Sequence, residues 1–289
     1  MIQSKIVKTD PNLDHIYIVP LGDLHIADPA GIGGYTHIKN RVVYNDLTKK
    51  FQDMLSWMIE NKNVYSILMG DVFDTALKTS IGNPSKALYD LDDAKEYATE
   101  LLTPFASTGR LIGGIDGNHE HRLYKDGGNS LVNDLCERLT NHLEEDKKVT
   151  YFHSQCGFLF LKVGNNKDFK NDKYRPYDYS VMFHHGRGGG STSGGKLNAV
   201  NKMIRMAPAD LYIMSHVHAT IAEKQRYVDR DIRTGKLYYK KRYLMIAGCW
   251  LGYANYAIEG MYPPAVVGVG RARLNGEPYK HGWDIHVSI

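Results

Sequence analysis

The sequence predicts an α/β fold, and three observations support this prediction. Short apolar runs alternate with longer segments in which apolar residues recur at a helical period. Several of these runs end directly in Gly, Asp, Asn or His, as strands that lead into loops do. The 289 residues are 43% hydrophobic and 24% charged, which supports a sizeable core and excludes disordered, collagen-like and coiled-coil chains.

Three strands and two helices are expected in the first 115 residues. The strands are 16–21, 64–69 and 110–115, the helices are 40–60 and 86–102, and a glycine-rich loop covers 28–35. Apolar residues between Val43 and Ile59 recur every three or four positions, as on one face of a helix. Thr103 and Pro104 are expected to end the second helix, because proline has no amide hydrogen to donate.

The remaining residues read as further strands with two more helices. Helices are expected at 130–143 and 197–206, and strands at 149–153, 158–163, 179–184 and 211–214. The strands on either side of Gly157 are expected to be joined by a short turn. Turn signals at 233–236 and 275–276 divide the C-terminal part, and strands within 219–289 are expected to complete the second sheet. No repeat or low-complexity linker appears, so 1–289 is predicted to be a single domain.

Net charge, cysteine content and hydropathy limit the possible partners and cellular location of the protein. A net charge of +4 permits a nucleic-acid partner without requiring one. The three cysteines form no C-x-x-C pair, which argues against both a disulfide framework and a thiolate zinc site. The first residues lack the apolar core of a signal peptide, and no apolar run approaches the roughly 20 residues of a membrane span. A cytoplasmic protein without a membrane partner is therefore expected, and its oligomeric state is left open.

Polar side chains follow five of the predicted strands, where loops of an α/β sheet converge on a ligand crevice. These residues are Asp23, His25, Asp71, Asn118, His119, His185, His216 and His218. Carboxylate, amide and imidazole ligands suit Mn, Fe or Zn. Without His119 they supply seven ligands, which is too many for one tetrahedral ion and suits two ions that share Asp71. Two divalent cations about 3.5 to 4 Å apart are a known clamp for displacement at phosphorus.

The blocks Asp23-x-His25, Gly70-Asp71, Gly117-Asn118-His119-Glu120, His185-Gly186 and His216-x-His218 resemble, in order, the signature of the calcineurin-like metallophosphoesterases. The Gly-Asn-His-Glu block is expected only about 0.003 times by chance at this composition, whereas an H-x-H pair is expected roughly 0.6 times. The resemblance implies a four-layer αββα sandwich of the metallo-dependent phosphatase type. It also implies two metal ions, with manganese favoured over iron or zinc. Asp23, His25, Asp71 and His218 would bind the first ion, and Asp71, Asn118, His185 and His216 the second.

The resemblance further implies hydrolysis of a phosphate ester by metal-activated hydroxide. His119 would protonate the leaving oxygen, a step typically contributing roughly 10² to 10⁴ in rate. Asp74 would orient a ligand imidazole or simply cap a helix. Arg122 is a candidate for binding a phosphate oxygen, with a plain surface role as the alternative.

Several residues of these blocks have other readings. Asp23, Asp71 and Asn118 taken singly are common turn or cap residues, although caps do not explain the histidines. His184 and His185 compete for one ligand position, and His185 is favoured because it precedes the glycine as in the family.

The segment Gly190 to Lys196 nearly fits the P-loop pattern, but Leu197 replaces the required Ser or Thr. A P-loop is therefore rejected. Two interpretations remain: a lid that brings Lys196 and helix amides to a substrate phosphate, and a plain connecting loop.

The sequence leaves several classes of substrate possible. Cations and tyrosines interleave over 226–243, which suits a nucleic-acid backbone as well as an exposed hairpin kept soluble by charge. The sequence after Asp71 lacks the Asp-Arg-Gly of the Ser/Thr protein phosphatases, which lowers that reading. A phosphodiesterase, with nucleic acid or a nucleotide as substrate, is preferred over a phosphomonoesterase or protein phosphatase. A noncatalytic metal-binding scaffold is the alternative of another class, and the presence of His119 argues against it.

Overall fold

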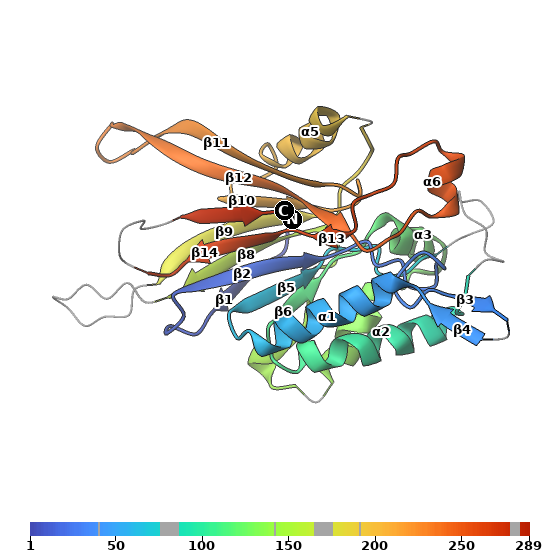
Figure 1. Cartoon of the computed structure of the whole chain (residues 1–289). Helices are drawn as coiled ribbons and strands as arrows, with labels where there is room; N and C mark the ends of the chain where they lie inside the picture. The colour runs from blue at the N-terminus through green and yellow to red at the C-terminus, as the bar shows by residue number, and fades with distance from the viewer. Residues whose placement is uncertain (40, 76–86, 142, 165–175, 191, 278–283) are drawn as a thin grey trace.

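The computed structural model describes residues 1–39, 41–75, 87–141, 143–164, 176–190, 192–277 and 284–289. Two β-sheets lie face to face, with α1 (Asp46–Glu60) and α2 (Leu91–Ala106) on one side and α5 (Ser193–Met203) on the other (Figure 1). This arrangement is a four-layer α/β sandwich, so the predicted fold class is confirmed.

The first sheet, here called the β2 sheet, has a parallel centre and an antiparallel edge. Its strands, in spatial order, are β15 (Ile285–Ser288), β14 (Arg271–Asn275), β2 (His15–Leu21), β5 (Val64–Leu68), β6 (Leu111–Gly114) and β7 (Thr150–Tyr151). Helices α1, α2 and α4 (Leu131–Thr140) cover its outer face, each with a buried apolar side. No helix in the described ranges is both long enough and apolar enough to cross a membrane.

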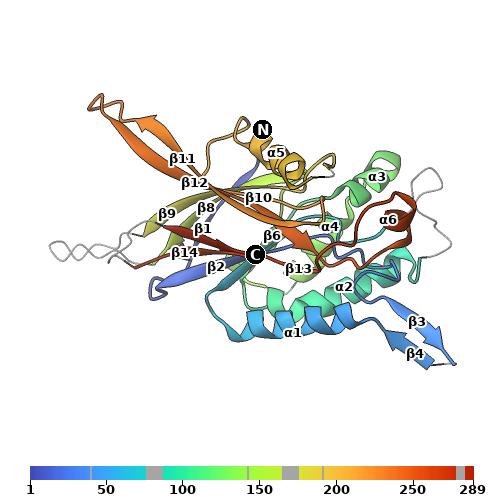
Figure 2. The same cartoon turned by 45° about the horizontal axis from the view of Figure 1, so that its top comes forward.

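The second sheet, here called the β10 sheet, mixes parallel and antiparallel pairs. Its strands, in spatial order, are β1 (Ser4–Lys8), β8 (Cys156–Val163), β9 (Tyr177–His184), β10 (Leu211–Met214), β12 (Leu237–Cys249) and β11 (Thr220–Arg230), and β13 (Gly268–Val269) pairs with the end of β12. Strands β11 and β12 form a long hairpin whose far end extends beyond the sandwich (Figure 2).

Three apolar clusters fill the spaces between the four layers. Phe51, Phe105 and Leu135 pack between the helices and the β2 sheet. Met245 on β12 packs between the two sheets, whereas its neighbour Leu244 packs under α5. This alternation follows from the two-residue period of a strand and fixes which side chains of β12 face the interior.

Smaller elements surround one end of the sandwich. The hairpin of β3 (Tyr35–Ile38) and β4 (Arg41–Tyr44), helix α3 (Asn118–Gly127) and helix α6 (Asn255–Glu259) lie there in Figure 1, and a short 3₁₀ helix, η2 (Glu145–Lys147), follows α4. Helix α3 and strand β1 are elements that the sequence did not predict. The alternation of β1 is short and half exposed, and the strand is held by parallel pairing with β8.

Several predicted helix boundaries are wrong, and helix α5 spans Ser193–Met203 where 197–206 was predicted. Helix α1 starts at Asp46, because Asn45 caps it by accepting a hydrogen bond from the Thr48 amide and the preceding residues pair as β4. Helix α2 continues through Pro104 to Ala106. A proline in the last turn is tolerated here because the Ser107 amide still donates to the Thr103 carbonyl. Residue 86, where the sequence places the start of α2, lies outside the described residues.

Two predictions about strand pairing are also wrong. The segments 149–153 and 158–163 do not form a hairpin, since β7 pairs with β6 and β8 pairs with β1 and β9 in the other sheet. The strands within 219–289 do not complete one sheet. They divide, with β11 to β13 in the β10 sheet and β14 and β15 in the β2 sheet. Strand pairing depends on contacts distant in sequence, which local hydrophobic patterns do not specify.

Arg110 holds the end of α1 against the β2 sheet, and its loss is expected to destabilise the fold. Its buried guanidinium donates hydrogen bonds of 2.6 to 2.8 Å to the carbonyls of Met58, Ile59, Asn61 and Val64. Substituting Arg110→Gln leaves most of these acceptors unpaired, and we expect the free energy of unfolding, measured in urea, to fall by about 3 kcal/mol. The exposed Arg138→Gln, which breaks only a pair with Asp134, is the control and should cost under about 0.5 kcal/mol. Equal losses would show that Arg110 has no special role.

Candidate metal centre

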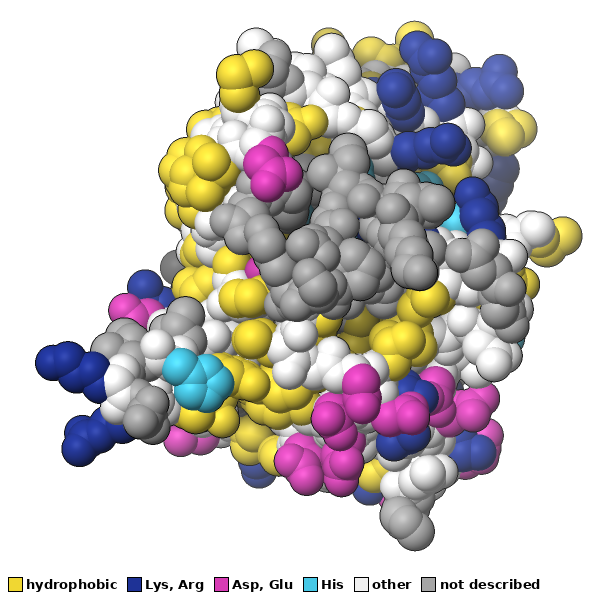
Figure 3. Space-filling view, turned by 90° about the vertical axis from the view of Figure 1, so that its right-hand side faces the viewer, with side chains coloured by type: hydrophobic (Ala, Val, Ile, Leu, Met, Phe, Trp, Pro, Cys, Tyr) yellow, Lys and Arg dark blue, Asp and Glu magenta, His cyan; other side chains and the backbone are white. Residues whose placement is uncertain are grey.

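The fold gathers the candidate ligands at one end of the sandwich. They follow the carboxyl ends of β2, β5, β6, β9 and β10, and Asp23 and His218 meet although 195 positions separate them. The first three strands belong to the β2 sheet and the last two to the β10 sheet, so both sheets contribute candidate ligands. The end of the molecule that faces the viewer in Figure 3 has Lys and Arg side chains gathered at its upper right and Asp and Glu side chains along its lower edge.

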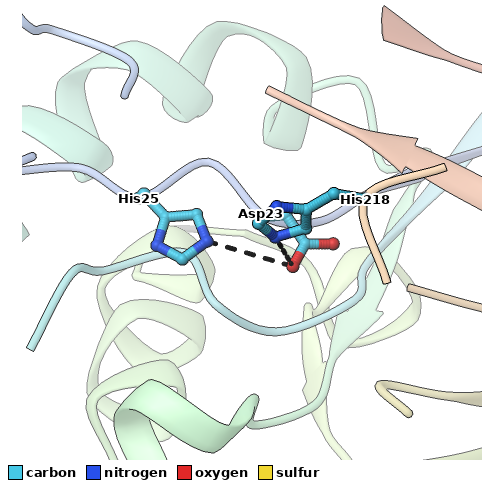
Figure 4. Close-up of side chains that lie close together, drawn as sticks. All are labelled: Asp23, His25 and His218. Atoms are coloured by element: carbon cyan, nitrogen blue, oxygen red, sulfur yellow. Dashed lines mark hydrogen bonds and ion pairs between the residues drawn. The ribbon is translucent and has the colours of Figure 1, made fainter. Parts of the chain in front are cut away.

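Asp23, His25 and His218 form a first cluster. Their ligand atoms all lie within 4.8 Å of one another. The Nε2 atom of His218 is 3.2 Å from Asp23 Oδ1, and the Nε2 atom of His25 is 4.0 Å from the same oxygen. Both imidazole rings point toward the Asp23 carboxylate (Figure 4). Asp23 is fully buried and His25 almost fully buried.

Asp71, His185 and His216 form a second cluster under the same distance criterion. The Nε2 atom of His185 lies 3.3 Å from Asp71 Oδ2 and 3.0 Å from Asn118 Oδ1. The Nδ1 atom of His185 contacts the Met69 carbonyl at 2.8 Å, which fixes the ring orientation. Asn118 therefore adds an oxygen ligand beside the three residues of the cluster.

A hydrogen bond joins the two clusters. The His216 amide donates to Asp23 Oδ2 at 3.0 Å, so a residue of the second cluster contacts the first. The His119 amide donates to Asp71 Oδ1 at 2.9 Å. Asp71 groups with His185 and His216 and not with the first cluster, so its sharing between two ions stays a prediction.

Asp74 joins His25 to His119 in a third group. Asp74 Oδ1 is 2.8 Å from His119 Nδ1 and 3.7 Å from His25 Nδ1. This position places Asp74 beside two imidazoles, as the predicted orienting role requires. The alternative, a helix cap, depends on residues 76–86, which lie outside the described residues. His119 also approaches the second cluster, with its Nε2 atom 3.9 Å from Asp71 Oδ2. Asp74 Oδ1 therefore lies beside Nδ1 of the His119 ring, while Nε2 of the same ring faces Asp71.

Five candidate ligands have a backbone conformation that side chains rarely adopt. Positive φ angles occur at Asp23, His25, Asp71, His216 and His218, with values between 44° and 70°. Left-handed backbone at non-glycine residues costs of order 1 kcal/mol or more each and persists only where the surroundings enforce it. Five such conformations in these loops indicate that the fold tolerates a loss of stability in order to direct these side chains toward one another.

Glu120 is a positioning residue that sequence reasoning missed. Its buried carboxylate accepts hydrogen bonds from the amides of Asp71 and Gly117 on one oxygen and from the Phe73 amide on the other, at 2.8 to 3.0 Å. It thereby ties the loop after β5 to the loop after β6. The Gly-Asn-His-Glu block contained this signal, but only the fold shows which amides the carboxylate meets. Burial and the neighbouring Asp71 raise the pKa of Glu120 to about 7, and the backbone donors oppose this rise.

Carboxylates and histidines in the two clusters shift the pKa values of one another. Burial alone would raise the pKa of Asp23 and of Asp71, but the neighbouring histidines, chiefly His218 and His185 respectively, lower both. Burial would lower the pKa of His185, yet the carboxylates of Asp71 and Asp23 raise it to about 10. Burial and the nearby His185 lower the pKa of His216 to about 4. The two buried carboxylates therefore remain anionic, as cation ligands must be.

The other predicted residues lie outside the three clusters. His184 turns away from them, and its Nδ1 atom accepts a hydrogen bond from the Gly186 amide, so the geometry favours His185 as the ligand. The ring of His121 stacks on Tyr124. Arg122 has a buried Nη1 atom without a hydrogen-bond partner among the described residues. Lys196 is half-buried in the first turn of α5, near enough to Cys249 to act on the pKa of that thiol.

The donors fit a pair of divalent cations. His25 Nε2 is buried and has no hydrogen-bond partner among the described residues, although it points at Asp23. An unsatisfied buried nitrogen is costly unless another partner takes its lone pair. Carboxylate, imidazole and amide donors without thiolate match manganese, iron or zinc. The residues present thus suit metal binding.

Gly117 permits the close approach of the loops after β5 and β6. A Cβ atom at this position would lie 2.0 Å from Asp71 Oδ1. The substitution Gly117→Ala is therefore expected to displace the Asp71 carboxylate and weaken manganese binding at least tenfold, measured by calorimetry. Gly189→Ala is the matched control, because a Cβ there meets no atom within 4 Å. Unchanged affinity in Gly117→Ala would mean that this carboxylate does not hold a metal.

Comparisons with known proteins leave the family open. No protein-family model matches the chain, and no curated protein matches it. Among solved structures, a single mutant of Vps29 from Entamoeba histolytica is 12% identical, with 90% of this chain and 87% of that chain covered and a TM-score of 0.38. A double mutant of the same protein is 11% identical over 65% of this chain and 87% of that chain, with a TM-score of 0.27. Likeness at this level carries no argument about this chain, whose site stands on its own geometry.

Proposed function

We propose that this protein is a phosphoesterase that uses two divalent metal ions, manganese first among them, to hydrolyse a phosphodiester. The observation that carries the proposal is the pair of adjoining clusters with His119 beside them. Two sets of carboxylate and imidazole ligands in contact through a single hydrogen bond suit two neighbouring cations. A single structural ion would need only one of these sets.

Asp23, His25 and His218 would hold one ion, and Asn118, His185 and His216 the other, with Asp71 between them. When bound, such a pair of ions polarises the phosphoryl oxygens and supplies a hydroxide nucleophile near neutral pH. The buried position of Asp23 and Asp71 keeps water away from the carboxylates and strengthens their attraction for cations. The contact of His185 with the Met69 carbonyl keeps its Nε2 atom directed at the site.

His119 is the residue that we assign to proton donation. Its Nδ1 atom is 2.8 Å from Asp74 Oδ1, so the carboxylate can hold the ring in place. Its Nε2 atom lies 3.9 Å from Asp71 Oδ2, and a leaving oxygen bound near the two clusters would take its proton from there. Burial would raise the pKa of Asp74, but the neighbouring His119 and His25 lower it, so the group remains a carboxylate.

Lys196 and Arg122 are the proposed substrate contacts. Lys196 lies near the start of α5, where the positive end of the helix dipole favours an anion. We expect Lys196→Ala to raise the KM for a phosphodiester several-fold while kcat stays nearly constant, because the lysine would bind ground state and transition state alike. Lys202→Ala, in the last turn of the same helix, is the control. Unchanged kinetics in the Lys196 variant would reject this contact.

One comparison of substrates tests the proposed function. The purified protein is supplied with manganese and assayed in parallel on bis-p-nitrophenyl phosphate and p-nitrophenyl phosphate, with EDTA as the metal-free control. Faster hydrolysis of the diester supports the proposal. Faster hydrolysis of the monoester would replace it by a phosphomonoesterase or protein phosphatase. Binding of two manganese ions without activity on either ester would replace it by a noncatalytic metal-binding scaffold.

A further inference from the structure

The β11–β12 hairpin has two faces of different composition. In an antiparallel pair, directly opposed residues share a face, and the register joins Lys224 to Tyr243 and Arg226 to Lys241. The inner face, which continues the interior of the sandwich, consists of Lys224, Arg226, Val228, Arg230, Leu237, Tyr239, Lys241 and Tyr243. The outer face, which continues the α5 side, consists of Glu223, Gln225, Tyr227, Asp229, Tyr238, Lys240, Arg242 and Leu244.

Charge is segregated between these faces. The inner face carries four cations and no carboxylate of the two strands, whereas the outer face carries two cations and two carboxylates. On the outer face the cations have partners, because Lys240 pairs with Asp229 at 3.7 Å and Arg242 donates to Gln225 at 2.9 Å. The excess positive charge of the hairpin strands therefore lies on one side.

The inner cations remain available to an external anion. Lys224, Arg226 and Arg230 form no ion pair with any residue that the structure describes, and Lys241 reaches only Asp284, at 3.9 Å. The Arg226 guanidinium lies 4.2 Å from the centre of the Tyr239 ring, and Tyr239 is 68% exposed. Val228 and Leu237 are also exposed on this face, at 55% and 73%. Cations, an aromatic ring and apolar side chains thus alternate over one open surface.

Protection of the sheet edge does not account for this pattern. β11 is the edge strand of the β10 sheet, and lysine or arginine on such a strand discourages pairing with other chains. Charge on either face of the hairpin would protect the edge equally well, and charge on either face would also keep the hairpin soluble. Concentration of unpaired cations on one face, with the carboxylates confined to the other, instead creates a surface complementary to a polyanion.

We propose that the inner face of the β11–β12 hairpin binds a single strand of nucleic acid. The cations would contact successive phosphates, and Tyr239 would offer a ring on which a base can stack. An anionic membrane fits less well, because the apolar side chains are interspersed with arginines and do not form a continuous apolar area. The inference deepens the proposed function and rests on it in naming a polymeric phosphodiester as the substrate class.

The hairpin would act as an anchor at a distance from the metal centre. β11 begins two residues after His218 and runs for 11 residues, a span of about 35 Å. Its exposed part extends away from the sandwich (Figure 2). A nucleic-acid strand bound to the exposed part of the hairpin would have to be long to reach the two clusters as well. The hairpin would therefore favour a polymer over a mononucleotide as substrate.

The test compares two double variants with the same net charge. Arg226→Gln with Arg230→Gln removes two cations from the inner face, and Lys240→Gln with Arg242→Gln removes two from the outer face. Binding of a fluorescent oligothymidylate is measured by anisotropy over a range of salt, with EDTA present so that neither metal nor turnover contributes. Thermal melting of each variant verifies that it is folded.

We expect the inner variant to bind about tenfold more weakly at low salt and the slope of log Kd against log salt to fall by about 1.4, since each phosphate contact on a single strand contributes about 0.7. The outer variant should bind like the unaltered protein. Equal weakening in both variants, or no oligothymidylate binding by the unaltered protein, overturns the inference. Face-dependent binding to phosphatidylserine vesicles in place of the oligonucleotide also overturns it.

Failure of this inference is distinguishable from failure of the proposed function. Hydrolysis of bis-p-nitrophenyl phosphate by the unaltered protein reports on the metal centre alone. Hydrolysis without oligonucleotide binding would leave the phosphodiesterase and remove the anchor. Face-dependent binding without hydrolysis would leave the nucleic-acid surface and remove the catalytic role.

Discussion

Replacing Asp71 by asparagine is expected to lower the phosphodiesterase kcat by about 10³-fold, because loss of several kcal/mol of metal-supplied stabilisation has this effect. The substitution changes the charge and almost nothing else. Asparagine retains the Oδ1 oxygen that accepts the His119 amide hydrogen, but it cannot carry the negative charge that Asp71 holds beside His185. Neighbouring histidines lower the pKa of Asp71 despite its burial, so the anion is the form present at neutral pH.

The metal content of the Asp71→Asn variant shows, independently of the rate, whether the loss of activity comes from a loss of metal. Inductively coupled plasma mass spectrometry should find fewer than two manganese ions per chain in Asp71→Asn and two in the unaltered protein. Asp92→Asn is the control, since its side chain is 88% exposed and, among the described residues, forms an ion pair only with Lys95 near the start of α2. Two bound ions and full activity in Asp71→Asn would contradict both the ligand assignment and the shared position between the clusters.

Replacing His119 by glutamine is expected to lower kcat by roughly 10² to 10⁴-fold on a diester with a poor leaving group. The reason is that glutamine cannot deliver a proton from the position that Asp74 gives the imidazole. On bis-p-nitrophenyl phosphate the loss should be much smaller, because p-nitrophenolate leaves without protonation. The measurement is kcat for diphenyl phosphate and for bis-p-nitrophenyl phosphate with manganese present.

This dependence on the leaving group separates proton donation from a structural role. A variant that merely disturbed the site would lose activity on both esters equally, and such a result would remove His119 from the proposed step. His121→Gln is the matched control, because His121 is two residues away and its ring stacks on Tyr124 outside the clusters. It should behave as the unaltered protein on both esters.

Local patterns predicted those parts of the fold that depend on local forces. The run at 211–214 is a strand with the predicted bounds, and the turn signal at 233–236 lies between β11 and β12. The hydrophobic period and the turn residues depend on interactions between residues close in sequence, so they can be recognised from the sequence alone. The same patterns failed at Pro104, where the helix continues because the surrounding core and a remaining hydrogen bond hold its last turn.

The strand pattern indicated that the candidate ligands follow strands, and the motif resemblance divided them into two sets that share Asp71. The structure groups Asp23 with His25 and His218, and Asp71 with His185 and His216. It also reveals that the Glu120 carboxylate joins two loops by accepting hydrogen bonds from the amides of Asp71, Phe73 and Gly117. Such contacts join residues tens of positions apart, and a local motif contains no information about which backbone amide will face a given carboxylate.

The sequence by itself determined the α/β class, the strands that lead into the site and the chemical types of the ligands, because these follow from hydrophobic period and residue identity. Only the tertiary structure decided that the C-terminal strands divide between two sheets, that a hydrogen bond joins the two clusters of candidate ligands, and that four cations of the β11–β12 hairpin share a face with no carboxylate of these strands. The physical reason is register. A shift of one residue in strand pairing moves every side chain to the opposite face, and that register is set by packing between layers.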